Sequence, residues 1–108
     1  MSKKITRAKI NRYAVLCVLE EAQRPVGAKE LQEWTGIPMK DIITALRNLL
    51  SWSMIDPVME DDHKKYVLSK KGVGTVKFYR EVRHLDEYYT PPWRENPLPK
   101  QSDSNIEG

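Results

Sequence analysis

Residues 35–52, TGIPMKDIITALRNLLSW, decide the fold of this chain. Gly36 can take the left-handed conformation that ends one helix, and Pro38 suits the first turn of the next. Beyond it, apolar and polar positions recur every three or four residues, which predicts an amphipathic helix over residues 38–52. Its apolar stripe is expected in the core: Ile42, Ala45, Leu46 and Leu49. Its opposite stripe is polar: Lys40, Thr44, Arg47 and Ser51.

Two helices are predicted before this one. Residues 6–23 contain the run YAVLCVL at 13–19, which is apolar on every side, so we expect this helix to be covered by several neighbours. The segment RPVG at 24–27 ends it, because proline cannot continue the helical hydrogen bonds. A short helix over residues 28–35 follows, with Leu31 and Trp34 facing inward.

After Ser53 the pattern changes to that of strands. Residues 54–59 and 65–68 are expected to pair around a polar turn at 60–64. A polar joint at 69–72 then leads to a last helix over 73–85. The predicted fold class is therefore mainly α with a small β-hairpin, or α+β. We divide the chain into a basic arm (1–7), one domain (8–85) and a proline-rich, disordered tail (86–108).

The charge is distributed unevenly, although the net charge is only +3. The first twelve residues contain five basic side chains and no acidic one: Lys3, Lys4, Arg7, Lys9 and Arg12. Residues 85–108 contain two basic and five acidic residues, a net charge of −3. A basic body suits a polyanionic partner. The single cysteine, Cys17, excludes an intrachain disulfide and favours a reducing, cytoplasmic setting, and no apolar run is long enough for a membrane span.

The sequence contains no catalytic set and no cofactor motif, so we expect a protein that is not an enzyme and needs no cofactor. His63 and His84 are the only histidines, and neither belongs to a recognisable nucleophile or paired-acid arrangement. No glycine-rich phosphate loop is present. Asp61, Asp62 and His63 are adjacent on a turn and rarely converge on a metal without further ligands, so no metal site is predicted.

The order of these elements resembles the winged helix-turn-helix DNA-binding domains of prokaryotes, and more narrowly a group of small, largely uncharacterised bacterial members. The resemblance spans roughly residues 8–84. It rests on RYAVL (12–16), PVGAKEL (25–31), TGIP (35–38), the stripe Ile42, Leu46 and Leu49, and YVLSKKG (66–72).

This resemblance implies that the helix from Pro38 lies in the major groove of duplex DNA. Lys40, Thr44 and Arg47 are then the main candidate contacts, with Met39, Asp41 and Asn48 at the margins. Further candidates are the wing lysines, Lys64 and Lys65, and the arm residues Lys3, Lys4 and Arg7. The alternative for the three central residues is an ordinary solvated face, and for the arm a frayed terminus.

Two features depart from the family pattern. The turn between the strands carries Asp61 and Asp62, which a phosphate backbone would repel. The segment before the hairpin, SWSM at 51–54, has serine where such domains commonly place a glycine, which affects the expected geometry of that turn.

Apolar positions on the first and last helices suggest a homodimer, which would present two recognition helices to DNA. We expect Val15 and Leu19 on the outer side of the first helix, and a separate stripe of Phe78, Val82 and Leu85 on the last. The alternative is that both stripes pack internally. For function, a transcriptional regulator competes with a winged-helix protein–protein interaction module and with a replication or mobile-element accessory protein.

Overall fold

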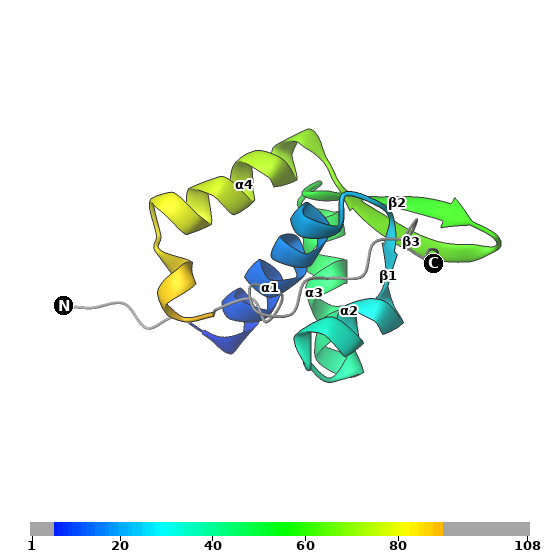
Figure 1. Cartoon of the computed structure of the whole chain (residues 1–108), viewed down its shortest axis with the longest axis horizontal. Coiled ribbons are helices and arrows are strands. Elements are labelled where there is room, and N and C mark those ends of the chain that lie inside the picture. Colours follow the sequence, from blue (N-terminus) through cyan, green and yellow to red (C-terminus); the bar gives the residue numbers. More distant parts are fainter. Residues whose placement is uncertain (1–5, 90–108) are drawn as a thin grey trace, which may run out of the picture.

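The computed structural model describes residues 6–89, except the side chain of residue 86. Four helices and a three-stranded antiparallel sheet form the fold (Figure 1). The elements are α1 (Arg7–Ala22), β1 (Val26–Gly27), α2 (Ala28–Thr35), α3 (Met39–Ser51), β2 (Ile55–Glu60), β3 (His63–Leu68), α4 (Lys70–Glu81) and a 3-10 turn (Leu85–Glu87). The α+β class predicted from the sequence is confirmed.

The sheet has the order β1-β3-β2, and its longer strands form a hairpin that extends away from the helices (Figure 1). β1 was not predicted: its two residues lie within the segment that we interpreted only as a helix break. Val26 pairs with Tyr66 and Gly27 with Lys65, so β3 holds β1 in place. Val26 is fully buried, which anchors this connection between α1 and α2 to the core.

The last helix begins at Lys70, three residues before the predicted start, and ends at Glu81 instead of 85. Ser69 caps it: its hydroxyl accepts a hydrogen bond from the backbone N–H of Gly72 at 3.0 Å. Two glycines in the first turns conceal this start in the sequence, because glycine is a poor helix former. His84 takes a left-handed conformation beyond the helix.

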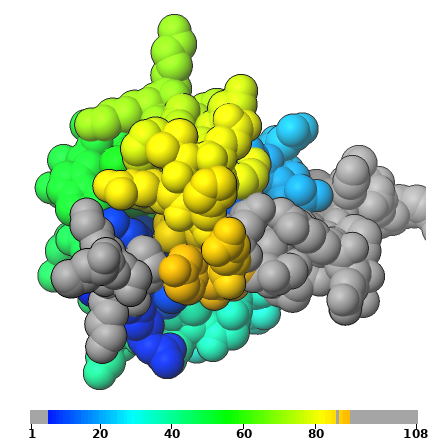
Figure 2. Space-filling model, turned by 90° about the vertical axis from the view of Figure 1, so that its left-hand side faces the viewer, coloured from blue at the N-terminus to red at the C-terminus, as the bar shows by residue number. Residues whose placement is uncertain are grey.

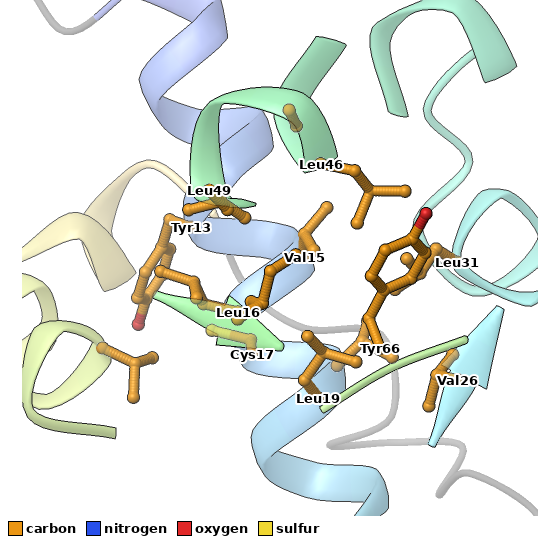
Figure 3. Packing of buried hydrophobic residues seen from close by; sticks show 14 of the residues in the cluster. Tyr13, Val15, Leu16, Cys17, Leu19, Val26, Leu31, Leu46, Leu49 and Tyr66 are labelled. Carbon is orange, nitrogen blue, oxygen red and sulfur yellow. The ribbon is translucent and has the colours of Figure 1, made fainter. Parts of the chain in front are cut away.

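α1 lies in the middle of the molecule and contacts α2, α3 and α4 (Figure 1). All seven residues from Tyr13 to Leu19 are at most 3% exposed, as expected for a helix that is apolar on every side. Figure 3 shows this packing, in which Val15 and Leu16 meet side chains of the other elements. The expectation that Val15 and Leu19 face outward is wrong, because the small domain uses both sides of α1 for its own core.

The packed structure continues past the predicted domain boundary at residue 85. Leu85 is fully buried, so it belongs to the core and not to an outer stripe with Phe78 and Val82. Tyr89 packs edge-on against Tyr13, with ring centroids 6.2 Å apart. The first residues of the predicted tail therefore cover the core, and residues 90–108 lie outside the described part of the chain.

A polar network joins α4 to α1 beside the only cysteine. Arg80 of α4 forms an ion pair with Glu20 of α1 at 2.6 Å, and its guanidinium also lies 3.9 Å from the Cys17 sulfur. Burial raises the pKa of the Cys17 thiol to about 11, although hydrogen bonds with Tyr13 and Arg80 partly oppose this shift. The thiol is therefore neutral and unreactive in the folded protein.

We expect Cys17 to resist a thiol reagent at about pH 8 in the native protein and to react rapidly in denaturant, since only the thiolate is nucleophilic. Because folding raises this pKa, stability should be intact below the ordinary thiol pKa and fall as pH rises through about 11. Urea unfolding across this range measures the loss. Cys17→Ala should weaken the dependence of stability on pH. Equal rates of labelling in native and unfolded protein would show that Cys17 is not a buried, neutral thiol.

The turn before the hairpin contains a strained residue. Ser53 has a φ of 60°, the left-handed region that non-glycine residues avoid. Its N–H donates to the Leu50 carbonyl at 3.0 Å, and its own carbonyl accepts from the Ser69 hydroxyl at 2.7 Å. These bonds hold the turn in the shape that glycine would adopt freely.

We therefore expect Ser53→Gly to raise the free energy of unfolding by about 0.5–1 kcal/mol, since glycine removes the steric cost. Ser51→Gly is the matched control: it makes the same change within α3, where glycine should lower stability by a similar amount. Chemical denaturation of the two variants provides the comparison. A destabilised Ser53→Gly protein would show that the turn is not under strain.

Candidate nucleic-acid interface

A short, well-bonded turn fixes α3 relative to α2. Gly36 has a φ of 75° and ends α2 by donating its N–H to the Gln32 carbonyl at 2.8 Å. The Thr35 hydroxyl donates to the Leu31 carbonyl at 2.7 Å and accepts from the Ile37 N–H at 3.1 Å. With so many backbone groups bonded, the start of α3 is held in one direction.

The two predicted faces of α3 are present. Ile42, Ala45, Leu46 and Leu49 are each at most 3% exposed and pack into the core. Lys40, Thr44, Arg47 and Ser51 are exposed along the opposite side. Ile43 lies beside them and is 41% exposed, which the sequence analysis did not anticipate. An apolar side chain at this place would suit a thymine methyl group.

The central and marginal residues of this face differ in exposure and in the groups that they could present to a partner. Thr44 is exposed, and its hydroxyl donates to the Lys40 carbonyl at 3.0 Å, so the hydroxyl proton is used within the helix while the oxygen can still accept a hydrogen bond. Met39 is half-buried and packs against the core, and Asn48 is half-buried as well. Lys40 and Arg47 are therefore the exposed charged groups on the face.

The first turns of α1 lie next to α3. A groove of about 220 Å³ separates the two helices. Arg7, at the start of α1, is exposed and lines this groove with Arg12, opposite Thr44 and Asn48. Lys3 and Lys4 lie outside the described residues. The groove thus brings two basic residues of the first helix beside the exposed face of α3, although Arg7 and Arg12 lie 37 and 32 positions before Thr44 in the sequence.

The tip of the wing is acidic, as the sequence indicated. Asp61 and Asp62 form a two-residue turn with φ of 51° and 64°, and both side chains are exposed. Positive φ at both positions is the usual solution for a tight hairpin. Lys65 is ion-paired with Glu60 at 2.9 Å, which leaves Lys64 as the exposed, unpaired lysine of the predicted pair within the described residues.

A second, larger groove lies between α2 and the wing. Its volume is about 810 Å³, and its lining includes Lys29 and Trp34 of α2 and His63 and Lys64 of β3. Among residues 6–89, no group of three metal-binding side chains comes together, and no helix is long and apolar enough to cross a membrane.

Solved structures with the same architecture establish what this arrangement is. MarR from E. coli, in its apo form, superposes with a TM-score of 0.63 at 16% identity, covering 86% of this chain and 73% of that one. The fold is a winged helix-turn-helix. A MarR-family transcriptional regulator from Rhodococcus sp. RHA1 gives a TM-score of 0.60 at 16% identity, with coverage of 82% and 67%.

The type III plasmid segregation protein TubR also shares this winged helix-turn-helix fold. It superposes with a TM-score of 0.57 at 16% identity, covering 76% of this chain and 92% of that one. No protein-family model and no curated protein sequence matches the chain. At these identities the likeness concerns the fold.

Proposed function

We propose that this chain binds duplex DNA with the exposed face of α3 in the major groove, and that it acts as a small cytoplasmic transcriptional regulator. The observation that carries the proposal is the pair of exposed cations on this face, Lys40 and Arg47, on a helix whose start is fixed by the bonded turn at 35–38. The winged fold normally places this helix against base edges.

The three central residues would have separate roles. Arg47 can donate two hydrogen bonds to a guanine, Thr44 can contact a thymine methyl through its own methyl group, and Lys40 can pair with a phosphate near the helix start. Met39 and Asn48 would limit the position of the helix from its edges. Lys64 would add a phosphate contact from the wing, while Lys65 would first have to leave Glu60.

The names of two proteins that share this fold support the proposal that the chain binds DNA. One is described as a transcriptional regulator, and another as a plasmid segregation protein. Because of the plasmid segregation protein, we keep an accessory role in DNA maintenance as an alternative to transcriptional regulation. Both roles require the same contacts with duplex DNA.

Selection of bound sequences from a random duplex pool tests the proposal. We expect an enriched motif of a few base pairs, with guanine at the position that Arg47 reads. Repeating the selection with Arg47→Ala should relax the preference at that position. Recovery of unchanged random sequence by the wild-type chain would contradict sequence-specific binding.

The acidic wing favours a second candidate, a winged-helix module that binds another protein. Glu60, Asp61 and Asp62 outnumber Lys64 and Lys65, so the hairpin carries a net charge of −1 over residues 60–65. A basic protein surface would suit this tip better than DNA would. Failure to bind any duplex, even at low salt, would favour this candidate.

We also propose a homodimer formed through α4. Phe78 in α4 and Val82 directly after it are 46% and 57% exposed, and the C-terminal end of α4, in yellow, lies at the surface of the molecule (Figure 2). Their burial against a second copy would pair two α3 helices on a symmetric site. Light scattering at tens of micromolar tests this, and a monomeric mass would contradict it.

A further inference from the structure

Arg12 differs from the other half-buried arginines in having no acidic partner in the described part of the chain. Arg24 is ion-paired with Glu30, and Arg80 with Glu20. Arg12 instead stacks on Trp52, with its guanidinium carbon 4.9 Å from the ring centroid. Its Nε is buried and has no hydrogen-bond partner among residues 6–89. A half-buried charge without a counter-charge is costly for the fold alone, which suggests a ligand.

The location of this arginine indicates which ligand fits. Arg12 lines the groove between α1 and α3, together with Arg7 and Asn11 from α1 and Thr44 and Asn48 from α3. Thr44 is also part of the exposed face of α3. A duplex with its major groove on that face would therefore pass a strand of its backbone close to the two arginines. Arginine donates several hydrogen bonds to a phosphate in a fixed planar geometry.

Trp52 holds the guanidinium in place. It is the residue that follows α3, is 40% exposed, and lies 40 positions from Arg12 in the sequence. Stacking on an indole ring limits the conformations of the arginine without using its N–H donors, so the terminal nitrogens, unlike the buried Nε, stay available for an anion. The only acid among the groove-lining residues is Asp41, which is half-buried.

We propose that this groove is a backbone phosphate site, in which Arg12 and Arg7 bind a DNA phosphate beside the bases read by α3, and Trp52 positions Arg12. The inference rests on the proposed function, which it extends. The main contact with the DNA backbone would then lie between α1 and α3. This groove is basic, whereas the tip of the wing is acidic. Asp41 would weaken the site by repulsion.

Duplex binding measured from about 50 to about 200 mM salt tests the site. Each phosphate contact contributes about −0.9 to the slope of log K against log salt. Arg12→Gln should reduce the magnitude of that slope by about 0.9 and weaken binding at low salt about five- to tenfold. Asp41→Asn should strengthen binding about threefold, because it removes the repulsion.

Two controls separate this site from a general effect of charge. Arg83→Gln removes an arginine that also lies over an aromatic ring, Phe78 of α4, at 5.8 Å, and it should leave the slope nearly unchanged. Trp52→Leu should reproduce part of the Arg12→Gln defect, while Trp52→Phe should retain a stacking surface and most of the affinity.

Each outcome decides between the proposals. If the wild-type chain binds duplex and Arg12→Gln has the same slope and affinity as Arg83→Gln, the phosphate site is wrong while DNA binding stands. If the wild-type chain binds no duplex at low salt, both proposals are overturned. Thermal unfolding of each variant shows whether the fold is retained, and Arg12→Gln decides the question if Trp52→Leu does not fold.

Discussion

Gly72→Ala is expected to destabilise the protein by about 3 kcal/mol or more, enough to leave much of it unfolded if it has the marginal stability of a small domain. A Cβ on Gly72 would lie 1.9 Å from the carbonyl oxygen of Met54 and 3.2 Å from Leu68 Cδ2. The Met54 carbonyl cannot easily retreat, because it accepts a hydrogen bond from the Ser69 N–H at 3.1 Å. The start of α4 therefore fits against the hairpin only with glycine at this position.

Gly74→Ala is the matched control, two residues along the same helix. Nothing lies within 4 Å of a Cβ at Gly74, so alanine there should stabilise α4 by about 0.5–1 kcal/mol through its higher helix propensity. Thermal or urea unfolding of the two variants gives the comparison. If Gly72→Ala is as stable as the wild type, α4 does not dock on the hairpin as described.

The double substitution Lys40→Ala, Arg47→Ala is expected to weaken duplex binding about 100-fold or more, since a base-reading arginine alone contributes roughly 1–3 kcal/mol. Both side chains are exposed, so the free energy of unfolding should change by less than about 0.5 kcal/mol. Titration of a labelled duplex with each protein measures the loss of affinity.

The single variants separate the two roles on α3. Arg47→Ala should lower affinity most for sites with the preferred base, whereas Lys40→Ala should weaken binding uniformly across sequences. Lys77→Ala, which removes an exposed charge from α4, is the control. Equal small losses for all three would show that α3 is an ordinary solvated face.

The sequence predicted α3 well because its pattern is local and redundant. Ile42, Ala45, Leu46 and Leu49 occur at helical spacing, so both faces of the helix follow from one short segment. The glycine and proline at 36 and 38 mark its start by their own backbone preferences. Such signals need no knowledge of the rest of the fold.

The features that sequence analysis missed depend on distant parts of the chain. β1 is too short to show a periodic pattern and exists because β3 pairs with it. Val15 is buried because α1 has neighbours on several sides. Periodicity cannot show which side of a helix is buried when every position of the run is apolar. The stacking of Arg12 on Trp52 joins two helices, so neither local segment indicated it.

Because the tip of the wing is acidic, we expect the first helix to supply contacts with the DNA phosphate backbone. The arm residues predicted to make these contacts are Lys3, Lys4 and Arg7, of which only Arg7 lies in the described residues. The structure places Arg7 and Arg12 on one groove beside α3. Lys65, which was predicted to contact DNA, forms an ion pair with Glu60 in the structure without DNA.

The most direct test of DNA binding is the affinity of the wild-type chain for a duplex as a function of salt. With Lys40, Arg7, Arg12 and the wing or arm lysines on phosphates, log K should fall with log salt at a slope of about −3 to −5 per chain. Absence of binding at about 50 mM salt, or binding that does not depend on salt, would contradict the account.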